Sequence, residues 1–461
     1  MRKIYQIILF ALFLTLSYSN SMAQTWQQVF KTGSWIDRMV FSKNTPGTVY
    51  IVLDSIPVDI VARDFSFYTM FGYGYRTSTD NGISFSDPKL SGYYILDIFE
   101  DPVNKNILLA SGYKMGLSGV LKSADKGITW SDDFVSSPAT YSILKFSESK
   151  ANPNRIFAAA VNGTYGLLSS DNYFTDCIFK DSIKVQARDL KISRSDNRLM
   201  FLAADSKNEN GVWHSKDSGE HWIKYETGLK GLRVFTVQPS TFFPGCVYCG
   251  ADSVGSDGSS YGCGIYMSLD TGKNWKRLAL TGFRVFSIEE NPYNPKFLAA
   301  ACDSGGVYFS GNYGRYWTSS NSGLPTGSSV RSVAYPYIVP DTAGASIYCT
   351  VDNKGIYKSI PVTTEVSDLM QNNFSNISIE SLYPQPASSY ANIIIKSNLP
   401  QNIRLYLSDL TGNCVKEIFD GFYLDSYQSL NIDTEDLTSG IYILKLEAGA
   451  AIINKKLIVN K

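Results

Sequence analysis

One short pattern recurs along this chain and restricts its fold more than any other feature. It reads Ser/Thr-x-Asp-x-Gly-x-x-aromatic, and full copies start at Ser78, Ser123, Ser215 and Ser268. A copy at Ser310 has Asn312 in place of the Asp, and a weaker copy, Ser169-Ser-Asp171-Asn-Tyr173, lacks the Gly. The starting residues of the six copies are 45, 46, 46, 53 and 42 residues apart. This period is typical of the four-stranded blades of a β-propeller.

Each residue type in the repeated pattern, which we call the box, has a structural use. Short Ser and Asp side chains hydrogen-bond the backbone of tight turns, and Gly supplies a positive φ. The aromatic residue then begins the next strand and buries its ring between neighbouring sheets. We therefore predict a turn-building role for the Asp, and no catalytic role. The residues predicted to build the boxes are Ser78, Asp80, Gly82, Ser123, Asp125, Gly127, Trp130, Ser215, Asp217, Gly219, Trp222, Ser268, Asp270, Gly272, Trp275, Gly314 and Trp317.

The ends of the repeat region predict how the ring closes. A last unit, residues 331–359, has three strand-like runs and no box after them. Residues 25–29 look like the strand that normally follows a box. We therefore predict an all-β fold with seven blades over residues 24–360, in which the N-terminal strand completes the last blade and removes its open edge. Six or eight blades are the alternatives.

These boxes resemble those of the Asp-box, or BNR-repeat, propellers. That group includes sialidases, sortilin-type receptors, xyloglucan-cleaving hydrolases and photosystem II assembly propellers. The resemblance covers residues 24–360. It implies the fold rather than an activity, because the repeated residues build the blade and not a site.

A different pattern follows a polar linker over residues 361–379. Alternating apolar strands with Gly, Asp and Asn turns over residues 380–461 predict a small Ig-like β-sandwich. Its landmarks are Tyr383-Pro-Gln-Pro-Ala387, Asp409-Leu-Thr-Gly412 and Gly440-Ile-Tyr442-Ile-Leu-Lys445. They resemble the type IX secretion (Por) C-terminal sorting domain of Bacteroidetes, with Gln385 where Asn is usual. The resemblance implies the type IX machinery as partner, removal of the domain, and release or surface attachment. A generic adhesive sandwich is the alternative.

The N-terminus predicts export. Arg2 and Lys3 precede an apolar run over residues 7–16, and Ser21-Met22-Ala23 provides small residues before Gln24. This is the pattern of a signal peptide over residues 1–23, and an uncleaved membrane anchor is the alternative. No later run is long and apolar enough for a transmembrane helix. We expect passage through the inner membrane, and then a location at the outer-membrane surface or outside the cell.

Composition narrows the partners. The 42 basic and 42 acidic residues balance, which argues against a nucleic-acid partner. With only two His and no metal-type CxxC pair, no metal and no cofactor is predicted. The seven Cys are scattered. A Cys249–Cys263 disulfide and buried free thiols both fit an exported protein, and the odd count leaves at least one thiol unpaired.

Polar residues recur at the ends of the predicted inner strands. Arginines lie at or near the starts of the innermost strands, and aspartates lie where the second strands end: Arg38, Arg188, Arg233, Arg284, Arg331, Asp54, Asp205, Asp252, Asp303 and Asp352. We expect them around the channel mouth on the face opposite the boxes. Two interpretations stay open: an Arg–Asp ladder that joins neighbouring blades, or a ligand site that recognises carboxylates or sugar hydroxyls. The aromatic loop containing Phe67 and Tyr68 is expected on the same face.

The first functional hypothesis is a non-catalytic exported protein that binds a glycan or a protein. The alternative is a glycoside hydrolase, either sialidase-like or glucan-cleaving. Phe283-Arg284-Val285 lacks the Ile and Pro of the sialidase signature Phe-Arg-Ile-Pro, and xyloglucanase-like enzymes need two propellers where this chain has room for one. If the arginines form a ligand site, Arg233→Ala and Arg284→Ala leave the melting temperature unchanged and abolish binding. If they form a ladder, the same changes destabilise the protein.

Overall fold

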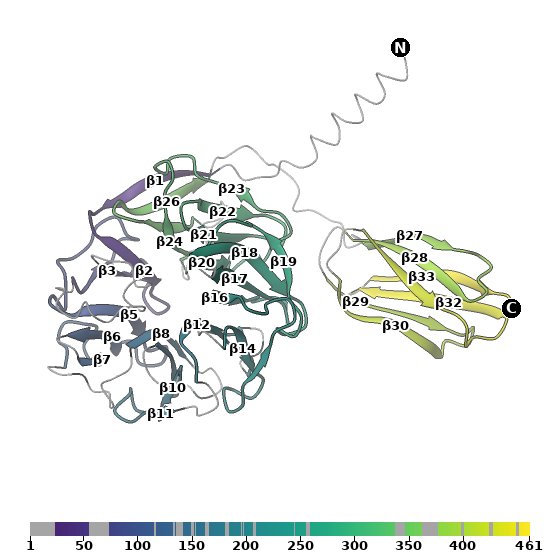
Figure 1. Cartoon of the computed structure of the whole chain (residues 1–461), viewed down its shortest axis with the longest axis horizontal. Coiled ribbons are helices and arrows are strands. Elements are labelled where there is room, and N and C mark those ends of the chain that lie inside the picture. The colour runs from purple at the N-terminus through teal and green to yellow at the C-terminus, as the bar shows by residue number, and fades with distance from the viewer. Residues whose placement is uncertain are drawn as a thin grey trace, which may run out of the picture. The chain divides into compact units, whose positions relative to one another are not determined.

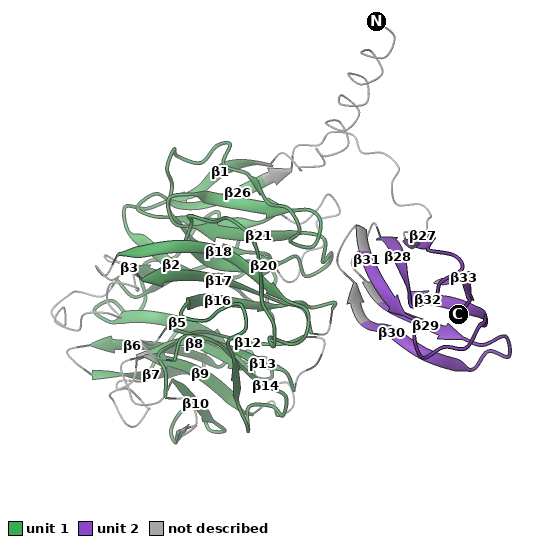
Figure 2. Cartoon of the chain, turned by 45° about the vertical axis from the view of Figure 1, so that its right-hand side comes forward, with its two compact units in different colours: residues 1–362 green, residues 363–461 purple. Residues whose placement is uncertain are grey.

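The computed structural model describes residues 24–54, 73–114, 117–131, 134, 142–148, 152, 154–161, 166–179, 184–194, 196, 198–205, 209–243, 245–254, 259–336, 346–361, 377–397, 401–423, 427–448 and 451–461. The chain divides into two compact units, Met1–Val362 and Thr363–Lys461 (Figure 2). No helix among these residues is long and apolar enough to cross a membrane.

The first unit is a seven-bladed β-propeller whose antiparallel sheets surround a central axis (Figure 1). Blade 1 contains β2 (Trp35–Phe41), β3 (Val49–Asp54) and β4 (Tyr75–Ser78). Blade 2 contains β5 (Tyr94–Glu100), β6 (Leu108–Lys114) and β7 (Leu117–Ser123). Blade 3 contains β8 (Ser142–Glu148), β9 (Ile156–Val161), β10 (Leu167–Ser170) and β11 (Ile178–Phe179). Blade 4 contains β12 (Ala187–Ile192), β13 (Met200–Ala204), β14 (Gly211–Ser215) and β15 (Ile223–Tyr225). Blade 5 contains β16 (Arg233–Pro239), β17 (Val247–Val254), β18 (Ser260–Ser268) and β19 (Lys276–Ala279). Blade 6 contains β20 (Val285–Glu290), β21 (Leu298–Cys302), β22 (Gly306–Ser310) and β23 (Thr318–Ser319). Blade 7 contains β24 (Val330–Ala334), β25 (Tyr348–Val351) and β26 (Gly355–Pro361).

The ring closes on the N-terminal strand. β1 (Gln24–Lys31) pairs antiparallel with β26 and is therefore the outermost strand of blade 7. Trp26 is buried there, its indole Nε1 donates to the Ser320 carbonyl at 2.6 Å, and its ring stacks on Phe309 of blade 6. The innermost strands contact one another in the order β2, β5, β8, β12, β16, β20, β24 and back to β2.

The box residues form the same hydrogen bonds in successive blades. In blade 1, Ser78 Oγ donates to Asp80 Oδ1 at 2.7 Å and accepts from the Gly82 amide at 2.8 Å. Asp80 Oδ1 also accepts from the Ser84 amide at 2.9 Å. Gly82 has a φ of +80°, a conformation that favours Gly. The equivalent bonds recur at Ser123, Ser215, Ser268 and Ser310.

In blade 3 the box lies one residue later than the sequence pattern predicted. Ser170 Oγ donates to Asn172 Oδ1 at 2.9 Å and accepts from the Phe174 amide at 2.8 Å. Phe174 occupies the Gly position with a φ of +68°, and its buried ring packs on Phe146. The prediction that started the box at Ser169 was therefore wrong, because Phe174 replaces the Gly that marks the register elsewhere.

The box tryptophans are not equally buried. Trp222 and Trp275 are 7% and 6% exposed, and each donates from Nε1 to the carbonyl of its box Gly. Trp130 and Trp317 are half-buried. Of these four, only Trp222 and Trp275 are fully buried, each in a cluster between two neighbouring blades.

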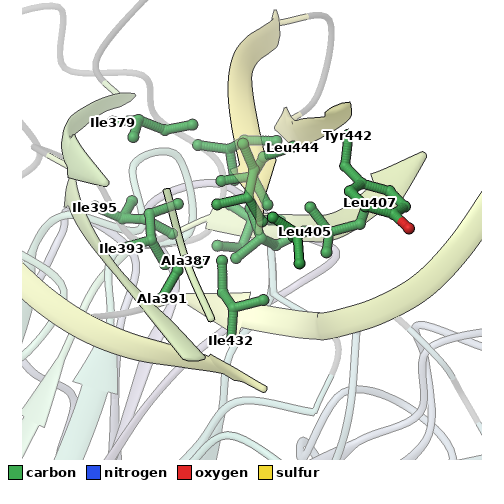
Figure 3. Packing of buried hydrophobic residues seen from close by; sticks show 14 of the residues in the cluster. Ile379, Ala387, Ala391, Ile393, Ile395, Leu405, Leu407, Ile432, Tyr442 and Leu444 are labelled. Carbon is green, nitrogen blue, oxygen red and sulfur yellow. The ribbon is translucent and has the colours of Figure 1, made fainter. Parts of the chain in front are cut away.

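The second unit is a small Ig-like sandwich with two sheets. One sheet contains β27 (Ile377–Tyr383), β28 (Tyr390–Ser397) and β31 (Tyr427–Asp433), and the other contains β30 (Cys414–Tyr423), β29 (Gln401–Ser408), β32 (Gly440–Ala448) and β33 (Ala451–Val459). Alternate residues such as Ile393, Ile395, Leu405 and Leu444 meet between the sheets (Figure 3). Ala387 of the Tyr-Pro-Gln-Pro-Ala motif is buried and bridges in parallel to Val459. β26 ends at Pro361 and β27 starts at Ile377, so both strands extend into the predicted 361–379 linker.

All seven cysteines are free thiols. Cys249 is buried, and burial raises its pKa well above the ordinary value. Cys263 packs against the same apolar cluster without forming a disulfide.

Candidate functional site: the central channel

A β-bulge at the same point of each innermost strand sets which side chains face the channel. The bulged residues are Asp37, Leu96, Leu144, Arg188, Phe235, Phe286 and Arg331. A bulge re-aims the side chains around it. The residues that follow these seven form a second layer, which we call the inner ring: Arg38, Asp97, Lys145, Asp189, Thr236, Ser287 and Ser332.

Four of the predicted arginines and four of the predicted aspartates form a ladder on blades 4 to 7. Asp205 contacts Arg188 of its own blade at 2.7 Å and Arg233 of the next blade at 3.6 Å. Asp252 repeats this arrangement with Arg233 at 2.5 Å and Arg284 at 3.2 Å. Each of these aspartates therefore joins two blades.

The ladder ends at blade 7 with a pair of acids. Asp303 lies 3.9 Å from Arg284 and accepts from Ser329 Oγ at 2.8 Å. Arg331 contacts Asp352 at 3.2 Å. Burial, with Asp303 nearby, raises the pKa of Asp352 to about 6 in spite of Arg331. A carboxyl with a raised pKa weakens the fold above that pKa, and the penalty is relieved as the pH falls through about 6.

Aromatic rings lie between the guanidinium groups of the ladder. Arg188, Arg233 and Arg284 all lie within 6 Å of the Phe235 ring centroid. Arg331 lies 4.5 Å from the Phe286 centroid. These contacts cover the channel end on this face with paired charges and aromatic rings.

Of the remaining predicted residues, the structure describes only the side chain of Arg38, which does not join the ladder. Arg38 lies three positions beyond Trp35, the residue that pairs with Asp54, and its Nη1 contacts Asp97 Oδ1 at 2.7 Å. Arg38 therefore belongs to the inner ring, and its assignment to the channel mouth was wrong. Asp54 ends β3, and its side chain lies outside the described residues. Phe67 and Tyr68 also lie outside the described residues.

The inner ring carries alternating charges on blades 1 to 4. Arg38 pairs with Asp97, and Lys145 pairs with Asp189 at 3.0 Å. Both aspartates also accept an amide hydrogen bond from the next blade, Asp97 from Phe146 and Asp189 from Val237. The inner ring therefore joins neighbouring blades in the first half of the ring, as the ladder does in the second half.

Electrostatics within the inner ring shift two pKa values. Burial and the nearby Arg38 lower the pKa of Lys145 to about 8. Burial opposes ionisation of Asp189, but Lys145 and Lys191 hold its pKa at about 2. The Asp189 carboxylate is thus ionised across the physiological range.

The channel contains a cavity of about 340 Å³. At the ladder end its lining stops at the bulged residues. At the other end the lining continues past the ends of β2, β12, β16, β20 and β24 to Lys43, Arg194, Thr241, Pro292 and Tyr335. These residues belong to or border the hairpins that join the first and second strands. The cavity therefore extends toward the face that carries those hairpins.

The ionised groups of the cavity lining balance. Seven are cationic and seven are anionic: Arg38, Lys43, Lys145, Arg188, Lys191, Arg194 and Arg331, against Asp37, Asp97, Glu100, Glu148, Asp189, Glu289 and Glu290. Lys43 pairs with Glu148 at 3.0 Å, and Lys191 pairs with Glu289 at 2.8 Å. The lining thus offers hydrogen-bonding groups with no excess of either charge.

The sequence interpretation missed most of this lining. Asp97, Lys145, Asp189 and Gln238 stand in no repeated motif. An alignment on the buried aliphatic residue before each bulge would have collected the inner ring, because that position is apolar in every blade: Ile36, Ile95, Ile143, Ala187, Val234, Val285 and Val330.

Comparisons with known proteins agree with both units. Residues 381–460 match the family described as a secretion system C-terminal sorting domain. No curated protein matches the chain. YCF48 from Cyanidioschyzon merolae is 11% identical with a TM-score of 0.52, covering 73% of this chain and 98% of that one. A structure of YCF48 bound to D1 peptide is 14% identical with a TM-score of 0.50, covering 73% and 96%.

A larger protein shares the fold as well. The GH74 xyloglucanase from Xanthomonas campestris is 13% identical with a TM-score of 0.54, covering 92% of this chain and 65% of that one. At these identities the likeness concerns the fold alone. The chain consists of a seven-bladed β-propeller followed by a C-terminal sorting domain, which directs its export by type IX secretion to the outer membrane or cell surface.

Proposed function

We propose that the exported propeller is a non-catalytic binding protein for an extracellular glycan or protein ligand. We place its site at the hairpin end of the channel, rather than over the Arg–Asp ladder. The observation that carries this proposal is the cavity that extends toward the hairpin face, with a charge-balanced lining. The ladder arginines are already paired with buried carboxylates, so they are poorly placed to receive a carboxylate ligand.

The carboxyl groups of the lining favour binding over hydrolysis. A glycoside hydrolase needs one carboxyl as acid and a second one as base or nucleophile. Burial raises the pKa of Glu290, which is the property of an acid. Its two oxygens, however, accept from Ser240 Oγ at 2.6 Å and from the Thr241 amide at 2.5 Å. Glu100 is held in the same way by Ser42 and the Lys43 amide. These carboxylates stabilise hairpins.

Proteins of this fold illustrate both alternatives. YCF48 is bound to D1 peptide in one structure, and the GH74 protein is named as a xyloglucanase. Since this chain shares only the fold with them, the choice between a binding function and hydrolysis depends on the residues that line its own channel.

Blocking the channel tests the proposed site. Ser287 lines the cavity on blade 6 and is half-buried, so Ser287→Trp should occlude it. Lys354 is exposed in the turn between the second and third strands of blade 7, on the ladder face, so Lys354→Trp is the matched control. On glycan and peptide arrays, we expect the parent and Lys354→Trp to retain the same ligand and Ser287→Trp to lose it. Both variants should keep the parental melting temperature within a few degrees. Loss in Lys354→Trp with retention in Ser287→Trp would assign the site to the ladder face instead.

Removal of the sorting domain tests the export route. A chain ending at residue 376 keeps every propeller strand, because β26 ends at Pro361 and β27 starts at Ile377. We expect this truncated protein to accumulate in the periplasm with Gln24 as its first residue, after signal-peptide cleavage. Fractionation, immunoblotting and N-terminal sequencing check both points. Undiminished surface or medium levels would contradict the assignment.

A further inference from the structure

We propose that the channel mouth between the first hairpins of blades 5 and 6 binds an uncharged oligosaccharide. This inference rests on the proposed binding function and specifies its ligand class. Three observations carry it: an exposed aromatic ring directly follows a lining residue in each of the two hairpins, a buried amide oxygen of the lining has no donor among the described residues, and uncharged hydroxyls line the channel on blades 5 to 7.

The aromatic rings belong to neighbouring hairpins. Phe242 lies between β16 and β17, and Tyr293 lies between β20 and β21; their exposed fractions are 42% and 48%. Each follows directly after a residue that lines the cavity, Thr241 and Pro292 respectively. Exposed rings beside a cavity are the usual platforms on which the C–H faces of neutral sugars stack, because the ring face carries partial negative charge.

Both hairpins are held in place before any ligand binds. Glu290 of blade 6 accepts from Ser240 Oγ and the Thr241 amide, which fixes the Phe242 hairpin to its neighbour. Asn291 Oδ1 accepts from the Tyr293 and Asn294 amides at 2.9 and 3.1 Å. A platform that is already ordered loses less conformational entropy on binding.

The side-chain amide oxygen of Gln238 is a buried acceptor, and its surroundings indicate a ligand that donates a hydrogen bond to it. It lines the cavity on blade 5, is 8% exposed, and donates from Nε2 to the Pro239 carbonyl at 3.0 Å. Its Oε1 is buried and accepts no hydrogen bond from the described part of the chain. A buried acceptor without a donor destabilises the unliganded protein, so a bound donor is favoured at this point. A sugar hydroxyl is a donor that would satisfy it.

The surrounding groups suit hydroxyls better than ions. Thr236, Ser287 and Ser332 are the three uncharged members of the inner ring, and all three lie on blades 5 to 7. The Lys191–Glu289 pair joins blades 4 and 6 in front of blade 5, and both side chains are about one-fifth exposed. An acidic sugar would find each cation of this pair already neutralised, whereas a neutral sugar can both donate to Glu289 and accept from Lys191.

Calorimetry with the full mature protein tests the ligand class. The probes are cellohexaose, mannohexaose and xylohexaose as neutral oligosaccharides, and hexagalacturonate as the acidic one. We expect saturable binding of at least one neutral probe and none of hexagalacturonate. Phe242→Ala and Tyr293→Ala should each weaken that binding about tenfold or more. Tyr316 is 60% exposed in the outer turn of blade 6, so Tyr316→Ala is the matched control and should leave Kd unchanged.

Gln238→Met provides a second readout that a structural role would not give. It should weaken neutral-sugar binding about tenfold while keeping or raising the melting temperature, because it removes an unsatisfied buried oxygen. Preference for hexagalacturonate, equal losses in Tyr316→Ala, or no binding of any neutral probe would overturn the inference. If peptides on an array are retained and Ser287→Trp abolishes that retention, the proposed binding function stands and the saccharide assignment fails.

Discussion

Arg233→Ala should destabilise the propeller by about 3–5 kcal/mol. Arg233 bonds both oxygens of Asp252, at 2.7 and 2.5 Å, and Asp252 is fully buried. Removing the guanidinium leaves a buried carboxylate with Arg284 as its remaining ladder partner, at 3.2 Å. Chemical denaturation of the full mature protein, followed by the fluorescence of the blade tryptophans, measures the loss.

An exposed ion pair provides the control for that measurement. Arg198 pairs with Asp196 inside one hairpin at 2.9 Å and is 67% exposed. Arg198→Ala should therefore change stability far less than Arg233→Ala, because water and salt screen an exposed ion pair. Equal, small effects of the two substitutions would show that the ladder does not hold the blades together, and would reopen the interpretation of Arg233 as a ligand-binding group.

Trp275→Ala should cost about 3–5 kcal/mol, the range for deletion of a large buried aromatic side chain. The Trp275 ring is 6% exposed and packs with Phe201, Val247 and Tyr266 between blades 4 and 5. Its indole also donates to the Gly272 carbonyl at 2.8 Å, so the substitution removes a turn contact as well.

Trp317→Ala is the matched comparison, because Trp317 has the same box position and the same indole bond to Gly314 but is only half-buried. We expect it to cost clearly less than Trp275→Ala in the same denaturation experiment. Equal losses would mean that the indole bond, rather than burial, dominates the contribution of the box tryptophan.

Local features of the sequence were sufficient for the fold. In a box such as Ser78–Phe85 the Ser and Asp side chains bond to backbone groups of the same box, so these residues mark the turn in the sequence. The Asn81 amide adds one bond to the Gly47 carbonyl of the first hairpin. The sorting-domain motifs could be recognised because they are short and keep their order along the chain. Blade 3 shows the limit of this approach: Phe174 adopts the Gly conformation, and the pattern alone placed the box one residue too early.

The sequence by itself determined the blades, their repeat and the sorting domain, because each is marked by short motifs that recur or keep their order along the chain. Only the tertiary structure showed which side chains face the channel. One bulged residue in each innermost strand shifts the register, and a shift of one residue turns a side chain to the opposite face of a strand. Arg38 therefore joins Asp97 in the inner ring, while Arg233 joins Asp252 in the ladder. Arg233 also contacts Asp205 of the preceding blade, and Arg38 contacts Asp97 of the next one. These cross-blade partners depend on how neighbouring blades pack, which a repeat pattern within one blade does not show.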